Sequence, residues 1–148
     1  MPKFKALKDG VNDALLASTR QKIEAYMKEI FHDHEIVQVE GVYSFVFGTI
    51  TVNIEVLPWH SEDVIVKVYS YLGENVLIDT ATSEQLLHLN TNIPLGCFGV
   101  TFEKQAIFSY SLTGANIDRS EFEASVQIVA KVADEYDEVI KQKQLANA

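Results

Sequence analysis

The stretch YSFVFGTITVNIEV, residues 43–56, decides the fold class of this chain. Large apolar side chains alternate with polar or smaller ones through it, which is the period of a half-buried β-strand. Gly48 stands where the alternation changes phase and predicts a tight reversal. Val64, Val66 and Val68 repeat the pattern after a loop expected over 58–63. Three successive strands with such short connections pair antiparallel, because parallel pairing needs a long crossover.

Helical spacing frames these strands on both sides. Apolar residues recur every three or four positions over 12–32 and again over 118–143, which predicts an amphipathic helix before the strands and a long one at the end. Capping-box patterns, with Gln or Glu three residues after Thr or Asp, predict helix starts at Thr82 and Asp118. The sequence therefore predicts three helices.

A second pair of strands is expected over 97–103 and from 105 or 106 to 112. The predicted order is α-β-β-β-α-β-β-α, with an antiparallel sheet packed against helices. No linker or repeat interrupts the chain, so a single α+β domain is predicted over 1–148, with frayed ends at 1–10 and 144–148.

The charge balance restricts the partners. The chain has 21 acidic and 12 basic side chains and a formal net charge of −9 at pH 7. A field of that sign repels phosphate backbones and anionic lipids, so neither nucleic acid nor a membrane is an expected partner. It attracts a basic polypeptide, although an acidic surface more often serves only solubility. No run approaches the ~18 apolar residues of a membrane span, and no secretory signal is recognised. The single Cys97 cannot form an internal disulfide, and a reducing cytoplasm is the expected location.

Residues with metal-binding or catalytic chemistry form no recognisable site. His32-Asp33-His34 is the densest group of potential ligands. It is either a chelating pair that needs a third ligand from elsewhere or, as we favour, a polar helix end at the negative pole of the dipole. Cys97 is either a nucleophile beside a base such as His88 or, again favoured, a small buried apolar group. No nucleotide-binding or nucleophile-elbow motif is present, so neither an enzyme, a metal nor a cofactor is predicted.

Some strands carry large apolar side chains in both of the rows that alternate along a strand, one row on each face of the sheet. In addition to the row that the helices should cover, large side chains are expected in the other row at Ile65, Tyr69, Tyr71, Phe108, Tyr110 and Leu112. A sheet face left in water rarely needs such residues, and tyrosines suit a surface that is only sometimes dry. One interpretation is a platform for a second subunit or a bound segment. The other is that loops or the last helix cover these residues, or that the rows are misassigned. The contact candidates are Tyr69, Tyr71, Phe108 and Tyr110.

Three stretches at turns and core positions carry a family resemblance. They are GVYSFVFG (41–48) running into 49–57, LLHLN (86–90) with IPLGCF (93–98), and VADEY (132–136). With them, nearly the full chain resembles the type III secretion chaperone-like superfamily, most closely its bacterial YbjN-type branch, often labelled sensory transduction regulators. The resemblance implies a small acidic protein, commonly a homodimer, that holds a partly unfolded client segment across hydrophobic patches and sheet edges. It assigns no individual binding residue.

The expected function is a non-enzymatic, peptide-binding or chaperone-like regulatory adaptor. Its expected partners are a second copy of itself and an unidentified protein or peptide. One alternative is a regulatory module with a small-ligand pocket, for which His60 or His88 near Trp59 are candidate polar groups. A metal- or thiol-dependent enzyme is a third.

Overall fold

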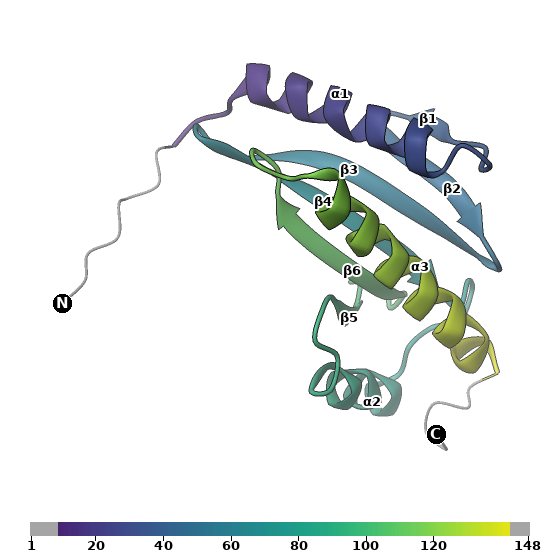
Figure 1. Cartoon of the computed structure of the whole chain (residues 1–148). Helices are drawn as coiled ribbons and strands as arrows, with labels where there is room; N and C mark the ends of the chain where they lie inside the picture. The colour runs from purple at the N-terminus through teal and green to yellow at the C-terminus, as the bar shows by residue number, and fades with distance from the viewer. Residues whose placement is uncertain (1–8, 143–148) are drawn as a thin grey trace.

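A computed structural model describes residues 9–142, which form three helices and six strands (Figure 1). The elements are α1 (Asp13–Ile30), β1 (Val37–Val39), β2 (Val42–Phe47), β3 (Ile50–His60), β4 (Asp63–Leu72), α2 (Thr80–Asn90), β5 (Cys97–Val100), β6 (Ala106–Thr113) and α3 (Arg119–Lys141). The strands form one antiparallel sheet in the order β1-β2-β3-β4-β6-β5. The predicted α+β class is confirmed. The fraying expected at 1–10 and 144–148 falls almost wholly outside the described residues.

The long helices begin at side chains that cap their first amide groups. Asn12 Oδ1 accepts a hydrogen bond from the Leu15 N–H at 2.9 Å before α1. Asp118 Oδ1 accepts from the Glu121 N–H at 2.8 Å before α3, as the capping-box pattern predicts. A cap of this kind stabilises a helix by about 1 kcal/mol. Within residues 9–142, no helix is long and apolar enough to cross a membrane.

The cap of α2 differs from the prediction. Asp79, not Thr82, is the capping residue, and its Oδ1 accepts a hydrogen bond from the Thr82 N–H at 2.8 Å. Aspartate and threonine both serve as caps, and the capping-box pattern favours Thr82 although Asp79 precedes it in the sequence. The helix therefore begins at Thr80, two residues before the predicted start.

The sheet is larger than predicted. β1 has no counterpart in the prediction, so four strands precede α2 rather than three; its three residues are exposed and too few to show alternation. β3 continues through Pro58 to His60, where a loop was predicted. Pro58 pairs with Val64 next to a bulge, a place in a sheet that tolerates a residue without an N–H group.

The register of the strands assigns every side chain to one of two faces. Phe45 pairs with Val52 and Ile54 with Val68, and this row continues through β6. These side chains are buried beneath α1 and α3, which lie across the same face, while α2 packs at the β5 end (Figure 1). We call this the helix face. The opposite face carries partly or fully exposed side chains in β3 and β4 and is called the open face.

Candidate functional site

The outer edge of β2 is only half paired. β1 pairs with β2 as far as Val37 opposite Ser44. β2 continues to Phe47, which pairs on the inner side with Ile50 of β3. Among the described strands none pairs with the outer side of residues 45–47, which we call the free edge. An unpaired strand edge is a template for adding another strand.

Val46 is the residue whose backbone groups face outward along the free edge. Its carbonyl oxygen lies 3.3 Å from Nδ1 of His34, a residue that precedes β1 and so lies on the outer side of β2. In an antiparallel ladder the N–H and C=O of one residue point to the same side, so the Val46 N–H also faces outward. The Val46 side chain is 65% exposed. An extended segment placed here meets a backbone donor, and an acceptor once His34 moves aside.

A hollow of about 430 Å³ lies on the helix side of the free edge. Its lining comes from the end of α1, β2 and α3: Phe31, His34, Phe45, Phe47, Val126, Gln127, Ala130 and Lys131. The rings of Phe31 and Phe45 stack with centroids 5.0 Å apart, which makes one wall aromatic. This helix-side hollow is therefore suited to an apolar side chain.

A second hollow, of about 390 Å³, lies on the other side of the same strand. It is lined by Asp33, His34, Glu35, Val37, Ser44, Phe45, Val46 and Thr51. Val37 and Val46 supply aliphatic surface, and Asp33 and Glu35 supply two carboxylates. The free edge thus runs between this open-side hollow and the helix-side hollow.

Two carboxylates of α3 hold the tip of the β2–β3 hairpin and thereby position the free edge. Asp134 Oδ1 accepts a hydrogen bond from the Thr49 N–H at 3.1 Å, and Asp137 Oδ2 accepts from the Thr49 hydroxyl at 2.7 Å. Gly48 has a φ of +57°, and a Cβ added there would collide with the Asp134 carboxylate. The turn therefore requires glycine both for its backbone conformation and for the close approach of α3.

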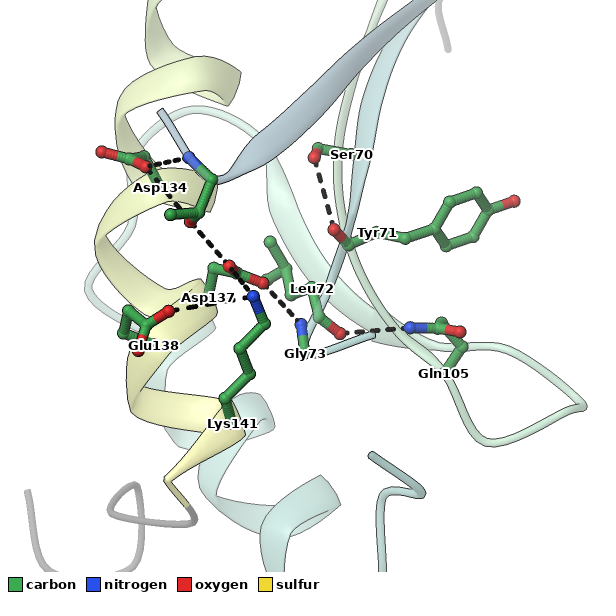
Figure 2. A network of polar contacts seen from close by, with 10 residues as sticks. Ser70, Tyr71, Leu72, Gly73, Gln105, Asp134, Asp137, Glu138 and Lys141 are labelled. Atoms are coloured by element: carbon green, nitrogen blue, oxygen red, sulfur yellow. Dashed lines mark hydrogen bonds and ion pairs between the residues drawn. The ribbon is translucent and has the colours of Figure 1, made fainter. Parts of the chain in front are cut away.

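Asp137 joins this tip to the end of β4 (Figure 2). It is only 2% exposed, accepts a hydrogen bond from the Gly73 N–H at 2.8 Å, and lies 2.9 Å from Lys141 Nζ. Burial raises the pKa of Asp137, but hydrogen bonds from Thr49 and Gly73 and the Lys141 ammonium outweigh it and leave the pKa below its ordinary value. The charged carboxylate is thus the form that the fold stabilises.

The opposite edge strand, β5, is closed by a side chain. Asn90, the last residue of α2, accepts a hydrogen bond from the Phe98 N–H at 2.8 Å and donates one from Nδ2 to the Phe98 carbonyl at 3.1 Å. The amide makes the two bonds that a paired strand residue would make. The β2 edge is therefore better suited than β5 to accept a strand.

Comparison with known proteins identifies the family. A family model described as "T3SS (YopN, CesT) and YbjN peptide-binding chaperone 1", or TY-Chap1, matches residues 17–144. The chain belongs to this family. Among solved structures it resembles the "Crystal Structure of the ExsC-ExsE Complex", with a TM-score of 0.60 and 17% identity over 85% of this chain and 96% of that chain. At this identity the similarity shows the fold alone. No match is found among curated proteins.

In this TY-Chap1 member, the four predicted contact residues are divided between the two faces. Tyr69 and Tyr71 lie on the open face, where their rings meet edge to face at 5.8 Å. Phe108 and Tyr110 lie on the helix face, and Phe108 is 0% exposed. The prediction assigned the wrong row in β6, because alternation defines two rows but only pairing with β4 decides which row faces the helices. Phe108 cannot contact a partner of the folded TY-Chap1 chain.

The middle of the open face is more polar than predicted. Glu55 and Lys67 face each other across β3 and β4, and Lys67 Nζ lies 4.9 Å from the Tyr69 ring centroid. Burial, followed by the nearby Glu55 carboxylate, raises the pKa of Tyr69 to about 12. The Ser44 hydroxyl donates to Asn53 at 2.8 Å. These polar groups lie side by side on the sheet, so this part of it does not form an apolar platform, which was one of the two interpretations of the sequence.

The metal and thiol candidates do not assemble. His32 Nδ1 lies 3.2 Å from the Glu29 carbonyl at the end of α1, in agreement with a polar helix end. Cys97 is exposed, so the prediction of a buried cysteine is wrong; it begins an edge strand, on the open face opposite Ser109. Between Asp9 and Gln142, no group of three or more His, Cys, Asp or Glu side chains could hold a metal ion.

The groups expected in a small-ligand pocket are engaged in local contacts. The rings of Trp59 and His60 lie 4.6 Å apart, and His60 Nδ1 accepts a hydrogen bond from the Glu62 N–H at 3.1 Å. His88 lies on α2, with Nε2 3.7 Å from the Glu84 carboxylate. A pocket built from these residues stays a prediction.

Neither the free edge of β2 nor the role of Asn90 in bonding Phe98 was predicted from the sequence. The stretch 41–48 was identified as a fold signature, and its second half is the free edge. No local pattern indicated the free edge, because it depends on where β1, whose three residues show no alternation, stops opposite β2. The role of Asn90 had no indication either, since asparagine is common at helix ends for other reasons.

Proposed function

We propose that this protein is a non-enzymatic chaperone or regulatory adaptor of the cytoplasm that binds an extended segment of another polypeptide by strand addition to β2. One observation carries the proposal: Val46 presents its backbone groups outward between two hollows on opposite faces of the strand. Membership in a peptide-binding chaperone family supports it. The similarity to a complex named ExsC-ExsE is in keeping with it.

In strand addition, different parts of the binding site determine the affinity for a peptide and the selectivity among peptides. Main-chain hydrogen bonds supply affinity, and pockets for alternate side chains supply selectivity. Here Val46 offers the main-chain groups, and the side chains of an added strand alternate between the helix-side and open-side hollows. His34 contacts the Val46 carbonyl in the free protein, so binding exchanges one hydrogen bond for another.

Amide hydrogen exchange of the full chain tests the proposal directly. A pool of synthetic peptides of about eight residues, a common strand length, serves as the probe. We expect bound peptides to slow exchange of the Val46 amide, because a new strand protects it. Peptides that bind without slowing Val46 exchange contradict the proposal, and so does a pool in which no peptide binds.

Two substitutions at one position separate backbone from side-chain effects. Val46→Pro removes the outward N–H group and is expected to abolish binding, whereas Val46→Thr keeps it and is expected to retain binding. Proline is tolerated at edge-strand positions whose N–H faces solvent, and circular dichroism checks the fold of both variants. Equal binding by the two variants would exclude strand addition at Val46.

The second copy of the proposed homodimer binds at the other end of the sheet. Large apolar side chains are exposed around α2 and β5: Leu77, Leu87, Leu95, Val100 and Phe102. A hollow of about 180 Å³ lies between α2 and β5, with Leu87 and Val100 in its lining. Phe102 projects fully exposed from the turn that follows. A projecting ring near a hollow is self-complementary, as a two-fold interface requires.

A further inference from the structure

The two hollows beside the free edge differ in charge. Lys131 lines the helix-side hollow, whose other residues include the stacked Phe31 and Phe45. Asp33 and Glu35 line the open-side hollow, and no lysine or arginine among residues 9–142 lines it. A basic side chain is therefore repelled on one side of the strand and attracted on the other.

The difference in charge between the two hollows selects for a pattern in the sequence of the bound segment. Successive side chains point to opposite faces, so the residues placed opposite the free edge enter the helix-side hollow and the open-side hollow in turn. Long basic side chains suit the open-side hollow in both of their parts. Their aliphatic stems can cover Val37 and Val46, and their charged heads can reach Asp33 and Glu35.

We infer that the segment bound at the free edge alternates large apolar residues with lysine or arginine, a conclusion that rests on the strand addition proposed above. The apolar residues occupy the helix-side hollow and the basic residues the open-side hollow. The formal net charge of −9 steers such a segment toward the protein as a whole. The two carboxylates then determine the side of the strand on which its charges lie.

The same charges disfavour a second copy of this chain at the free edge. The exposed edge segments that another copy would offer are its own free edge, residues 45–47, and β1, Val37–Val39, which Glu40 follows. Neither segment brings a basic residue to Asp33 and Glu35, and Glu40 would add a like charge nearby. The occupant is accordingly a different polypeptide.

Four synthetic peptides of about eight residues test the pattern by fluorescence anisotropy with the full-length protein. Three alternate leucine with lysine, glutamate or serine. The fourth has the composition of the leucine–lysine peptide with its leucines and lysines grouped in two blocks. We expect the alternating leucine–lysine peptide to bind about tenfold more tightly than each of the others, with an advantage that shrinks as salt is added.

Charge reversal locates the effect. Asp33→Lys combined with Glu35→Lys is expected to shift the preference from the leucine–lysine to the leucine–glutamate peptide. Asp9→Lys combined with Asp13→Lys is the matched control, since both residues are exposed at the start of α1, away from the free edge and from the α2–β5 surface, and the change in net charge is the same. The control protein should still prefer the leucine–lysine peptide.

The possible outcomes distinguish this inference from the proposal on which it rests. Equal binding of the leucine–serine and leucine–lysine peptides, with both lost in Val46→Pro, would overturn the charge pattern and leave strand addition intact. Equal binding of the alternating and block peptides would reduce the effect to nonspecific attraction and overturn the inference. If no alternating peptide binds, both conclusions fail.

Discussion

Asp137 of α3 accepts a hydrogen bond from the backbone N–H of Gly73, just after β4, at 2.8 Å. The same side chain accepts from the Thr49 hydroxyl in the β2–β3 turn at 2.7 Å. One buried carboxylate thus joins the last helix to the β2–β3 turn and to the end of β4. Because the free edge begins next to that turn, the position of the proposed binding strand depends on Asp137.

Removing this carboxylate should destabilise the fold substantially. Asp137→Ala leaves the buried Gly73 N–H and the Thr49 hydroxyl without an acceptor, and we expect a loss of about 3 kcal/mol in the free energy of unfolding. Urea unfolding followed by circular dichroism measures it. Glu138→Ala is the control, because Glu138 is exposed and lies 3.8 Å from the same Lys141 Nζ; it should cost under about 0.5 kcal/mol. Equal stability of the two variants would contradict this account.

The Asp137 carboxylate should also make the free energy of unfolding depend on pH in the acidic range. The pKa of Asp137 is lower in the folded state than its ordinary value, so the unfolded chain binds the proton first as the pH falls. The stabilisation is full above about pH 4 and is lost as the pH drops through the folded pKa. The difference in unfolding free energy between the wild type and Asp137→Asn should therefore narrow below about pH 4. A difference that stays constant into strong acid would show that the charge is not its source.

Asn90 is expected to protect the β5 edge. Asn90→Ala removes both hydrogen bonds to Phe98, so exchange of the Phe98 amide should accelerate and stability should fall by about 1 kcal/mol. The exposed edge should also increase association at high concentration, as measured by light scattering. Asn92→Ala, at an exposed position after α2, should change neither property. Unchanged exchange at Phe98 would indicate that Asn90 does not close this edge.

The proposed homodimer should dissociate when charge is placed at the α2–β5 end. Leu87→Lys combined with Phe102→Lys introduces like charges where two apolar surfaces would meet, so light scattering after size exclusion should report a monomer. Both residues are exposed, so the unfolding free energy measured on the monomer should change by less than about 0.5 kcal/mol for each. Val11→Lys, at an exposed apolar position before α1, should leave the oligomeric state unchanged.

Tyr69 and Tyr71 stay predicted contact residues on the open face. The double substitution to serine should weaken peptide capture or self-association while the helix content measured by circular dichroism is retained. Phe108→Ser is the contrasting variant, because it replaces a fully buried ring and should cost about 3 to 5 kcal/mol. If the tyrosine double variant unfolds as well, these residues belong to the core and not to a contact surface.

The fold was largely predictable because local sequence patterns indicate most of its helices and strands. α1 and α3 combine helical spacing with a capping side chain, and β2 to β4 combine alternation with short turns. β1 lacked any such pattern, and Pro58 concealed the end of β3 because proline usually interrupts a strand. Local rules therefore identified the elements better than their ends.

The site was less predictable because it depends on register and on unequal strand lengths. Whether Phe108 faces the helices or solvent is decided by how β6 pairs with β4, which alternation alone does not specify. The free edge exists because β1 stops opposite Ser44, a property of two strands together. Tyr69 and Tyr71, by contrast, were placed on the correct row because the valines of β4 define its buried side clearly.

The amide of Asn90 has a consequence for how copies of this protein can be arranged. A sheet that can grow at both ends is able to continue from molecule to molecule and form a fibril. With the outward backbone groups of Phe98 already bonded to Asn90, growth is hindered at the β5 end and favoured at the β2 end. Each molecule can then receive one guest strand at β2, while on its far side the backbone of Phe98 is already occupied and is not available for propagating a polymer.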